Sequence, residues 1–388
     1  MAIIFLILLF IFPLGEITRL QFSNGIAFTL NDIFIALTVT VWFIWRLIKR
    51  KELKIPLLKP IMIFAGFGLF SLIINILNLN SFQFLVSFLY LFRWLIYAGI
   101  YFVVFDFDPK FKRKIPVFMI IVGMIVVLIG FVQYFLYPSL RNLYYLGWDE
   151  HLYRMFSSFL DPNFLGVFFV LLFLLVFEFF FRTKERQKKI LMAVLSILIL
   201  VSIYLTFSRS AYAALVIGLT VFLVLENKRK WSLAMFGIII LVLILSLRNS
   251  NIENQNLFRT ASSIARIDSS LNAIKIIEKN PIFGVGFNAY RYAQIRYGFR
   301  GDQSLFSDHA GSGTDNSFLF ILATTGILGL SGYLYLTFSI FKNSLKLKST
   351  LLVSSLTSLI IASFFINALF YPFLMQWVWI LVGLTENK

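Results

Sequence analysis

Two arginines stand beside or between apolar runs of the chain, and both are candidates for binding an anion. Arg209 lies in Thr206-Phe207-Ser208-Arg209-Ser210, a polar break between two apolar runs, and a turn there needs no arginine. Arg266 lies on the polar side of an amphipathic pattern, two residues before Asp268. Because the planar guanidinium fork binds phosphate oxygens bidentately, the two side chains could form a pair suited to a pyrophosphate. The alternatives are a simple turn at Arg209 and a solvated charge at Arg266.

A cluster of groups that could accept a proton precedes a later apolar run. Asp308, His309 and Asp315 lie in a glycine- and serine-rich segment that is too polar to be a core. A carboxylate or an imidazole at a membrane interface could take a proton from an acceptor hydroxyl, so Asp315 and His309 are candidate catalytic residues. The alternative is that Thr314 or Asp315 caps the helix that is predicted to start at Asn316.

Arg93 and the segment Asp161-Pro162-Asn163 are further candidates for substrate binding. Arg93 interrupts an apolar run over 85–105, where an ionisable group costs on the order of 3 kcal/mol on insertion scales. A function is therefore favoured there over snorkelling or a structural hydrogen bond. Aspartate, proline and asparagine are ordinary helix-start residues, so local grounds favour helix capping for Asp161 and Asn163 over substrate binding.

The segment Asn280–Gly286 reads Asn-Pro-Ile-Phe-Gly-Val-Gly, and the amides of a glycine pair after a helix could cradle a phosphate. It lacks the strand–turn–helix context of a dinucleotide fold, so turn geometry is favoured. The chain has no cysteine, and its two histidines are His151 and His309, so we expect no transition-metal site. No EF-hand-like spacing is present, and we expect no cofactor.

These residues must be positioned by long apolar runs. Hydrophobic residues make up 60% of the 388, and the mean hydropathy is +0.87, whereas a soluble domain is roughly 45–50% apolar. Because a bilayer-spanning helix needs about 20 mostly apolar residues, the sequence predicts an all-α polytopic membrane protein of about 12 spans, with a single integral membrane domain over 1–388. The predicted spans lie near 2–14, 26–45, 60–78, 82–105, 115–137, 163–181, 190–207, 211–225, 231–247, 316–341, 349–370 and 373–384.

The net charge of +17 indicates topology and not nucleic acid, because no basic face studded with aromatic residues accompanies it. Basic residues resist translocation. With the N- and C-termini in the cytoplasm, most of the 35 lysines and arginines fall in inner connections, namely 46–59, 106–114, 182–189, 226–230 and 342–348. The short outer connections carry only Arg19, Arg141, Arg154 and Arg209.

The longest polar stretch, Arg248–Asp315, then lies outside the membrane between the ninth and tenth spans. Within it, apolar residues recur at spacings of three and four, which is typical of an amphipathic helix. They are Ile264, Ile267, Leu271, Ile274 and Ile277. We therefore expect a large extracytoplasmic loop over 248–315 that contains an amphipathic helix, which Asn280-Pro281 ends.

Four segments become informative when their order along the chain and their predicted sides of the membrane are considered together. They are Phe159–Gly166, Thr206–Ala211, Asn280–Gly286, and Thr314–Leu319 with Gly326–Gly329. Together they resemble the O-antigen ligase and Wzy-type O-antigen polymerase superfamily. The resemblance covers roughly 155–340 by motif, and the whole chain by span count and by the position of the outer loop.

The resemblance implies a GT-C-like helical membrane fold and a metal-independent enzyme at the outer face of the bacterial cytoplasmic membrane. Such an enzyme transfers a glycan from an undecaprenyl-pyrophosphate carrier to a hydroxyl of a glycan or lipid-core acceptor, and single displacement would invert the anomeric centre. Arg209 and Arg266 are then expected to bind the carrier pyrophosphate. Membrane lipids are the other expected partners, and nucleic acid is not expected.

The chain departs from the family pattern at one position. Ligases of this family usually carry His-Asn where this chain has Asp315-Asn316, so Asp315 or His309 is expected to act as the base, Asn316 is a candidate substrate-binding residue, and a polymerase is favoured over a ligase. Arg209, Arg266 and either Asp315 or His309 should converge on one outward-facing cavity. The rival functions are a transporter or flippase for a polar or lipid-linked substrate, and a scaffold subunit without activity.

Overall fold

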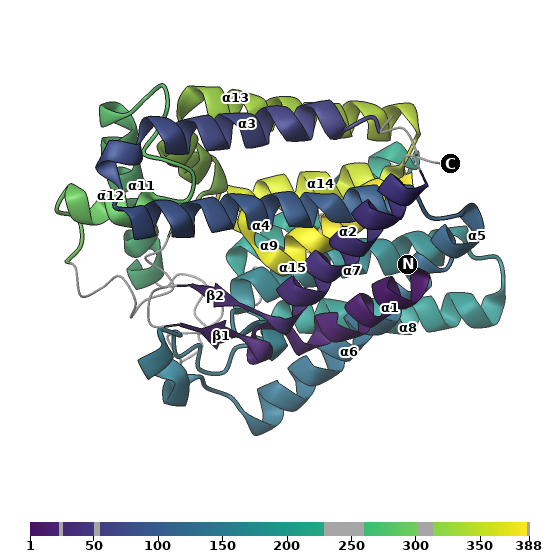
Figure 1. The fold of residues 1–388 in the computed structure, drawn as a ribbon. Helices are drawn as coiled ribbons and strands as arrows, with labels where there is room; N and C mark the ends of the chain where they lie inside the picture. The colour runs from purple at the N-terminus through teal and green to yellow at the C-terminus, as the bar shows by residue number, and fades with distance from the viewer. Residues whose placement is uncertain (23–25, 50–54, 229–259, 302–312, 386–388) are drawn as a thin grey trace.

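The structure is a bundle of long helices that run side by side (Figure 1). It is a computed structural model and describes residues 1–388 apart from 23–25, 50–54, 229–259, 302–312 and 386–388. The helices of the bundle are α1 (Ala2–Ile11), α2 (Leu30–Ile48), α3 (Leu58–Ile74), α4 (Ser81–Phe105), α6 (Ile115–Leu136), α7 (Pro162–Arg182), α8 (Arg186–Leu205), α9 (Arg209–Leu225), α13 (Ser317–Lys346), α14 (Thr350–Ser363) and α15 (Pro372–Thr385).

The prediction of an all-α chain rich in membrane-crossing helices is confirmed. In the part of the chain that the structure describes, six helices are long and apolar enough to cross a membrane. Five other predicted spans correspond to apolar helices of 10–17 residues, such as α14. At 1.5 Å per residue such helices fall short of a hydrocarbon core of about 30 Å, so a count of twelve full spans does not follow. The predicted span near 231–247 lies outside the described residues.

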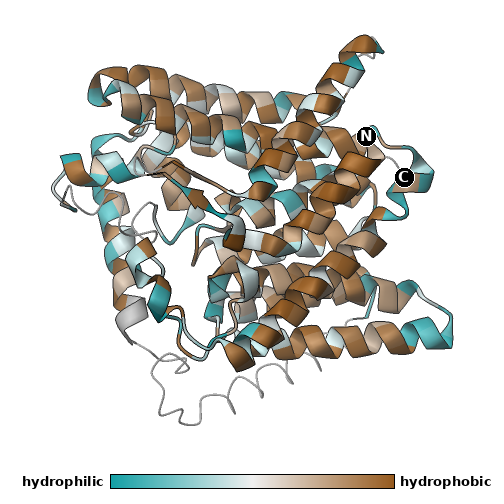
Figure 2. Cartoon of the chain, turned by 60° about the horizontal axis from the view of Figure 1, so that its bottom comes forward, coloured by the Kyte–Doolittle hydropathy of each residue, from teal (hydrophilic) through white to brown (hydrophobic). Residues whose placement is uncertain are grey.

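Polar residues gather at the two ends of the bundle, and apolar residues cover its length (Figure 2). One end carries the start of α1, the end of α15 and the short helix α5 (Pro109–Lys112) (Figure 1). The opposite end carries the remaining short elements. These are a hairpin of β1 (Leu20–Gln21) and β2 (Ala27–Phe28), α11 (Thr260–Lys279) and α12 (Tyr290–Arg296).

The core of the bundle is α7, whose residues from Leu165 to Val176 are all buried. It packs against α8, α9 and α14. Small residues allow the close approaches, because a Cβ added to Gly218 of α9 would overlap Ser358 of α14. The Ser358 hydroxyl instead donates a hydrogen bond of 3.0 Å to the carbonyl oxygen of Ala214. The phenylalanine- and leucine-rich sequence of α7 therefore marks a helix enclosed by protein on most sides.

The predicted amphipathic helix exists as α11, but its apolar stripe does not face the protein. Ile264 and Ile267 are more than half exposed, and Leu271 and Ile274 are nearly so. The helix packs on α13, and Ala273 is one of its fully buried residues. An exposed apolar stripe on a helix at the polar end of a membrane bundle is the surface that an interfacial helix buries in lipid.

A break in α13 determines how the loop elements dock. Gly326 has φ of +65° and ψ of −168°, which interrupts the helix. The carbonyls of Ala323 and Thr324 accept hydrogen bonds of 3.0 Å from the amides of Val285 and Gly286, and the Ile327 amide donates to Pro281 at 2.9 Å. The amides of Val285 and Gly286 are thus used in this docking, and the Gly284 amide donates to the carbonyl oxygen of Asn280, so the segment does not form a phosphate cradle.

Side chains of α3 hold the same junction. The Ser71 hydroxyl hydrogen-bonds to the carbonyls of Phe283 and Thr324 at 2.6 and 2.8 Å, and the Asn75 amide reaches the Gly284 carbonyl at 3.0 Å. Because Ser71 and Asn75 lie at the end of α3, the break lies toward the loop end of the bundle and not at its middle. That position differs from the midplane breaks that a transporter would use.

We expect Gly326→Ala to destabilise the protein. A Cβ at Gly326 would lie 2.1 Å from the carbonyl oxygen of Ile282, and the positive φ is strained for an L side chain. The loss in free energy of unfolding should exceed about 2 kcal/mol. Gly66→Ala is the matched control, because nothing lies within 4 Å of a Cβ there and the residue is helical. Thermal unfolding in detergent micelles measures both variants. Equal unfolding temperatures would contradict the docking of the loop against the break in α13.

Candidate active site

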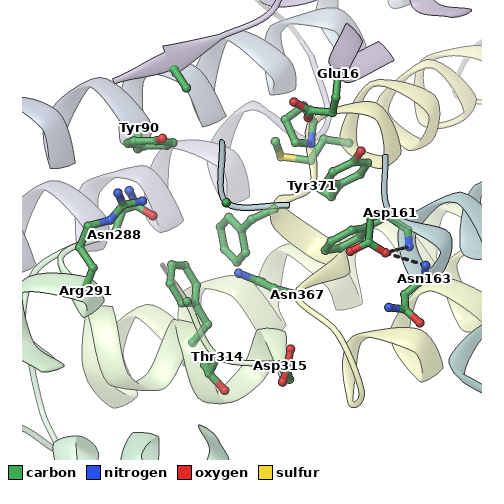
Figure 3. Close-up of a pocket in the computed structure, with 18 of the residues that line it drawn as sticks. Glu16, Tyr90, Asp161, Asn163, Asn288, Arg291, Thr314, Asp315, Asn367 and Tyr371 are labelled. Atoms are coloured by element: carbon green, nitrogen blue, oxygen red, sulfur yellow. Dashed lines mark hydrogen bonds between the residues drawn. The ribbon is translucent and has the colours of Figure 1, made fainter. Parts of the chain in front are cut away.

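A cavity of about 500 Å³ opens among the short elements at the loop end of the bundle. Segments far apart in the sequence form its walls, from η1 (Phe12–Thr18) and α4 to α11 and the start of α15. Five of the eight predicted site residues line it: Arg93, Asp161, Asn163, Arg266 and Asp315. Figure 3 shows Asp161 and Asn163 on one side, Asn288 and Arg291 on the opposite side, and Thr314, Asp315 and Asn367 between them.

Asp161 caps α7 and lines the cavity at the same time. One of its carboxylate oxygens, Oδ1, accepts hydrogen bonds from the amides of Asn163 at 2.6 Å and Phe164 at 3.3 Å (Figure 3), as the helix-start residues predict. Burial raises the pKa of Asp161, while these amides and the charges of Arg154 and Arg266 oppose the rise. The helix cap therefore places a carboxylate in the cavity within the field of Arg266.

Asn163 joins the start of α7 to the turn that carries Arg209. Its side-chain oxygen accepts hydrogen bonds from the Arg154 guanidinium at 3.2 Å and from the Ser208 hydroxyl at 3.3 Å. Arg154 is only 4% exposed, and its Nε donates to the carbonyl oxygen of Thr206 at 2.9 Å. In the sequence, Arg154 is recognisable only as an outer basic residue. Basic residues are rare in the short outer connections, and this rarity was the signal that could have identified Arg154.

Arg209 and Arg266 lie in one region of the site. Arg209 is the first residue of α9, after the Ser208 cap, and it is partly buried close enough to Arg266 for their positive charges to repel. Arg266 lines the cavity from α11, whereas Arg209 does not. Two guanidinium groups held against their mutual repulsion have the charge and the hydrogen-bond donors to attract an anion.

Asp315 is free of the capping task that the sequence analysis weighed for it. The predicted helix start at Asn316 is one residue early: α13 begins at Ser317, and its cap is Asn316, whose side-chain oxygen accepts from the amides of Phe318 and Leu319 at 2.9 and 3.0 Å. The Asn316 oxygen accepts from amides two and three residues later, which is the usual geometry of a helix N-cap. Asn316 does not line the cavity, and His309 lies outside the described residues.

The surroundings of Asp315 suit a proton acceptor. Its backbone amide donates to the Ser269 hydroxyl of α11 at 3.4 Å, which places Asp315 beside the helix that carries Arg266. Burial raises the pKa of Asp315, the nearby Arg266 lowers it, and the negative charge of Asp161 raises it further. A carboxylate with a raised pKa accepts a proton more readily than an ordinary aspartate.

Arg93 has a partner that the sequence analysis did not identify. Its guanidinium binds both carboxylate oxygens of Asp32 at 2.7 Å, and the Tyr97 hydroxyl donates to the same carboxylate at 2.7 Å. Asp32 belongs to the capping box of α2, so a routine helix-start residue also neutralises the membrane arginine. The structural hydrogen bond considered as an alternative for Arg93 is present, and the side chain still borders the cavity.

Several polar residues of the cavity escaped the sequence analysis. Among them are Glu16, Arg19, Asn288, Arg291 and Asn367. Asn288 and Arg291 lie two and five residues after the Gly-Val-Gly segment, which was the only local signal for them. In the described part of the chain, no group of three or more His, Cys, Asp or Glu side chains could hold a metal ion.

The fold and the cavity define a multi-pass membrane protein with a charged, partly buried site at one end of the bundle. A family model described as O-antigen ligase (Wzy_C) matches residues 194–334, the stretch that contains both Arg209 and Arg266 as well as Asp315. Over these residues, about a third of the chain, the match confirms the resemblance to the O-antigen ligase and polymerase superfamily. A search of curated proteins found no match.

We expect Arg154→Lys to destabilise the protein although it preserves the charge. The three N–H groups of a lysine ammonium share one nitrogen, so they cannot reproduce the spread of the guanidinium, which donates to Asn163, Thr206 and Phe207 from two nitrogens. Leaving buried acceptors unsatisfied costs about 1–3 kcal/mol. Thermal unfolding in detergent measures the loss. Arg141→Lys, at an exposed position of the same outer connection, is the control and should unfold like the wild type.

Proposed function

We propose that this protein transfers a glycan from undecaprenyl pyrophosphate to a hydroxyl of a glycan or lipid-core acceptor, at the outer face of the bacterial cytoplasmic membrane. The observation that carries the proposal is the convergence of Arg266, Asp161 and Asp315 on one cavity, with Arg209 beside Arg266. The matched O-antigen ligase domain supports this general class of reaction.

The orientation rests on charge. The basic connections at 106–114 and 182–189 join helices at the end of the bundle that holds the start of α1 and the end of α15, opposite the cavity (Figure 1). By the positive-inside rule that end is cytoplasmic, so both termini are cytoplasmic and the cavity faces outward. The carrier's isoprenoid chain then remains in the bilayer while its pyrophosphate reaches the cavity.

In the proposed reaction, Arg209 and Arg266 bind the pyrophosphate and stabilise the negative charge that grows on it as it departs. The acceptor hydroxyl oxygen attacks the anomeric carbon of the donor sugar, and the bond between that carbon and the pyrophosphate oxygen breaks. Undecaprenyl pyrophosphate leaves with the electron pair. A single displacement of this kind inverts the anomeric centre.

Asp315 is the proposed base that takes the proton of the acceptor hydroxyl. Its raised pKa and its release from helix capping support that role. His309, in a segment outside the described residues, remains the alternative base. Because aspartate stands where ligases of the superfamily usually carry histidine, we favour the polymerase reaction, in which the acceptor is itself a carrier-linked glycan.

The decisive experiment supplies the purified protein with undecaprenyl-pyrophosphate oligosaccharide, with and without a core-lipid acceptor. Longer carrier-linked chains identify a polymerase, and transfer to the core lipid identifies a ligase. A preparation that is folded by its thermal unfolding curve and yields neither product would reject both.

Arg209→Ala and Arg266→Ala should each lower turnover by roughly 100-fold or more, because each removes charge stabilisation of the leaving group. Arg296→Ala is the matched control, since this exposed arginine of α12 does not line the cavity. Initial rates of chain transfer at saturating donor and acceptor give the comparison. Equal losses of turnover in all three variants would contradict a special role for Arg209 and Arg266.

The rate should fall as the pH falls through the raised pKa of Asp315, because the base must be ionised. Asp315→Asn should abolish this acidic limb of the pH–rate profile, together with most of the activity. Asp161→Asn keeps an oxygen for the helix cap but removes a negative charge near Asp315, so it should shift the limb to lower pH. Profiles of kcat/KM against pH test this, with Asp268→Asn on the exposed side of α11 as the control. A limb that stays in place in Asp161→Asn contradicts the coupling.

A further inference from the structure

The Gly-Val-Gly segment positions two polar residues that the proposed chemistry does not yet use. After docking against the break of α13, the chain passes through Phe287 and turns at Asn288, which has a left-handed φ of +56°. Arg291 follows in α12, and both Asn288 and Arg291 line the cavity. A non-glycine residue held at positive φ beside a cavity is a common sign of a functional position.

The segment is held rigidly by buried aromatic packing. Phe287 is 3% exposed and packs edge-to-face against Phe64 of α3 and Phe370 near the start of α15, at ring distances of 6.2 and 6.1 Å. Asn288 and Arg291 are therefore presented from a fixed backbone and not from a loose loop. Rigid placement of polar groups is what a binding site requires.

Arg291 differs from Arg93 and Arg19, which also line the cavity. Arg93 is paired with Asp32, and Arg19 is paired with Glu16 at 3.1 Å. Arg291 has no acidic partner among the described residues, and its Nε is buried without a hydrogen-bond acceptor there. This arginine therefore has donors that the described protein does not satisfy.

Two neighbouring side chains carry unsatisfied atoms of a different kind. The Thr314 hydroxyl and the Asn367 side-chain oxygen, both on cavity-lining residues, are buried and have no hydrogen-bond partner in the described part of the chain. The carbonyl oxygen of Asn367 only accepts, the Arg291 Nε only donates, and the Thr314 hydroxyl does both.

This mixture of donors and acceptors identifies the class of ligand. A phosphate accepts hydrogen bonds but cannot donate to the Asn367 oxygen when it is fully ionised. Sugar hydroxyls donate and accept, and the apolar face of a sugar ring needs an apolar surface. The cavity offers that surface in Tyr90, Phe287 and Phe370. The wall thus suits a sugar ring better than a second phosphate.

The place of this wall relative to the proposed base assigns the sugar to the acceptor. Asn288 and Arg291 lie across the cavity from Asp161 and Asn163, and Asp315 lies between the two sides (Figure 3). We propose that Asn288 and Arg291 bind the acceptor sugar and present its hydroxyl to Asp315. This inference rests on the proposed function, since it presumes that the donor pyrophosphate occupies the side of Arg209 and Arg266.

Kinetics of glycan transfer test the assignment. Arg291→Ala should raise the KM for the acceptor roughly 10- to 100-fold, as expected for the loss of a charge-assisted hydrogen bond, and leave the KM for the donor unchanged. Asn288→Ala should act in the same direction. Arg296→Ala, on the same helix and outside the cavity, should leave both constants unchanged. A rise in the donor KM, or no change in the acceptor KM, overturns the proposal.

A direct binding measurement separates this proposal from the proposed reaction. The probe is the oligosaccharide released by mild acid from the carrier-linked glycan of the same cells, and calorimetry measures its binding to the full-length protein in detergent. Binding should weaken 10-fold or more in Arg291→Ala and Arg291→Lys, whose unfolding temperatures show whether they fold, and persist in Arg209→Ala. Failure of the wild type to bind, or equal binding by the Arg291 variants, overturns the sugar site. Binding without any transfer rejects the reaction alone.

Discussion

The interlock between the broken helix α13 and the loop after α11 is the constraint on which the site depends. Interrupting a helix leaves backbone carbonyls without their intrahelical partners, and such groups are costly when they are buried. At Gly326 the unpaired groups are satisfied by the amides of Val285 and Gly286 and by the hydroxyl of Ser71. The same bonds fix the direction in which the chain leaves toward α12.

The charged groups of this cavity affect one another strongly because they are buried together. Burial raises the pKa of both Asp161 and Asp315, the negative charge of Asp161 raises the pKa of Asp315 further, and Arg266 lies close enough to lower both pKa values. Asp32 neutralises the charge of Arg93, so the pair adds no net charge to the cavity wall. Arg266 and Arg291 also line the cavity and have no acidic partner among the described residues, so the cavity wall keeps their positive charge.

Part of this arrangement could be predicted from the sequence. Apolar runs predict spans because burial in lipid depends on composition and length, which are local properties. Helix-start chemistry at Asp161 was predicted correctly because a cap forms with amides two and three residues away. The cap of α13 was assigned one or two residues early, since adjacent threonine, aspartate and asparagine are nearly equivalent in local preference.

Partnerships between distant segments could not be predicted in this way. Nothing near Arg93 in the sequence points to Asp32, and nothing near Asn163 points to Arg154 or Ser208. The Gly-Val-Gly segment is as compatible with a phosphate cradle as with a turn until α13 is seen to occupy its amides. By itself the sequence determined the membrane class, the helices and the superfamily, because these follow from local composition and from motifs in order. The tertiary structure decided which charges are neutralised and which face the cavity, because burial and hydrogen bonding depend on what packs against each side chain.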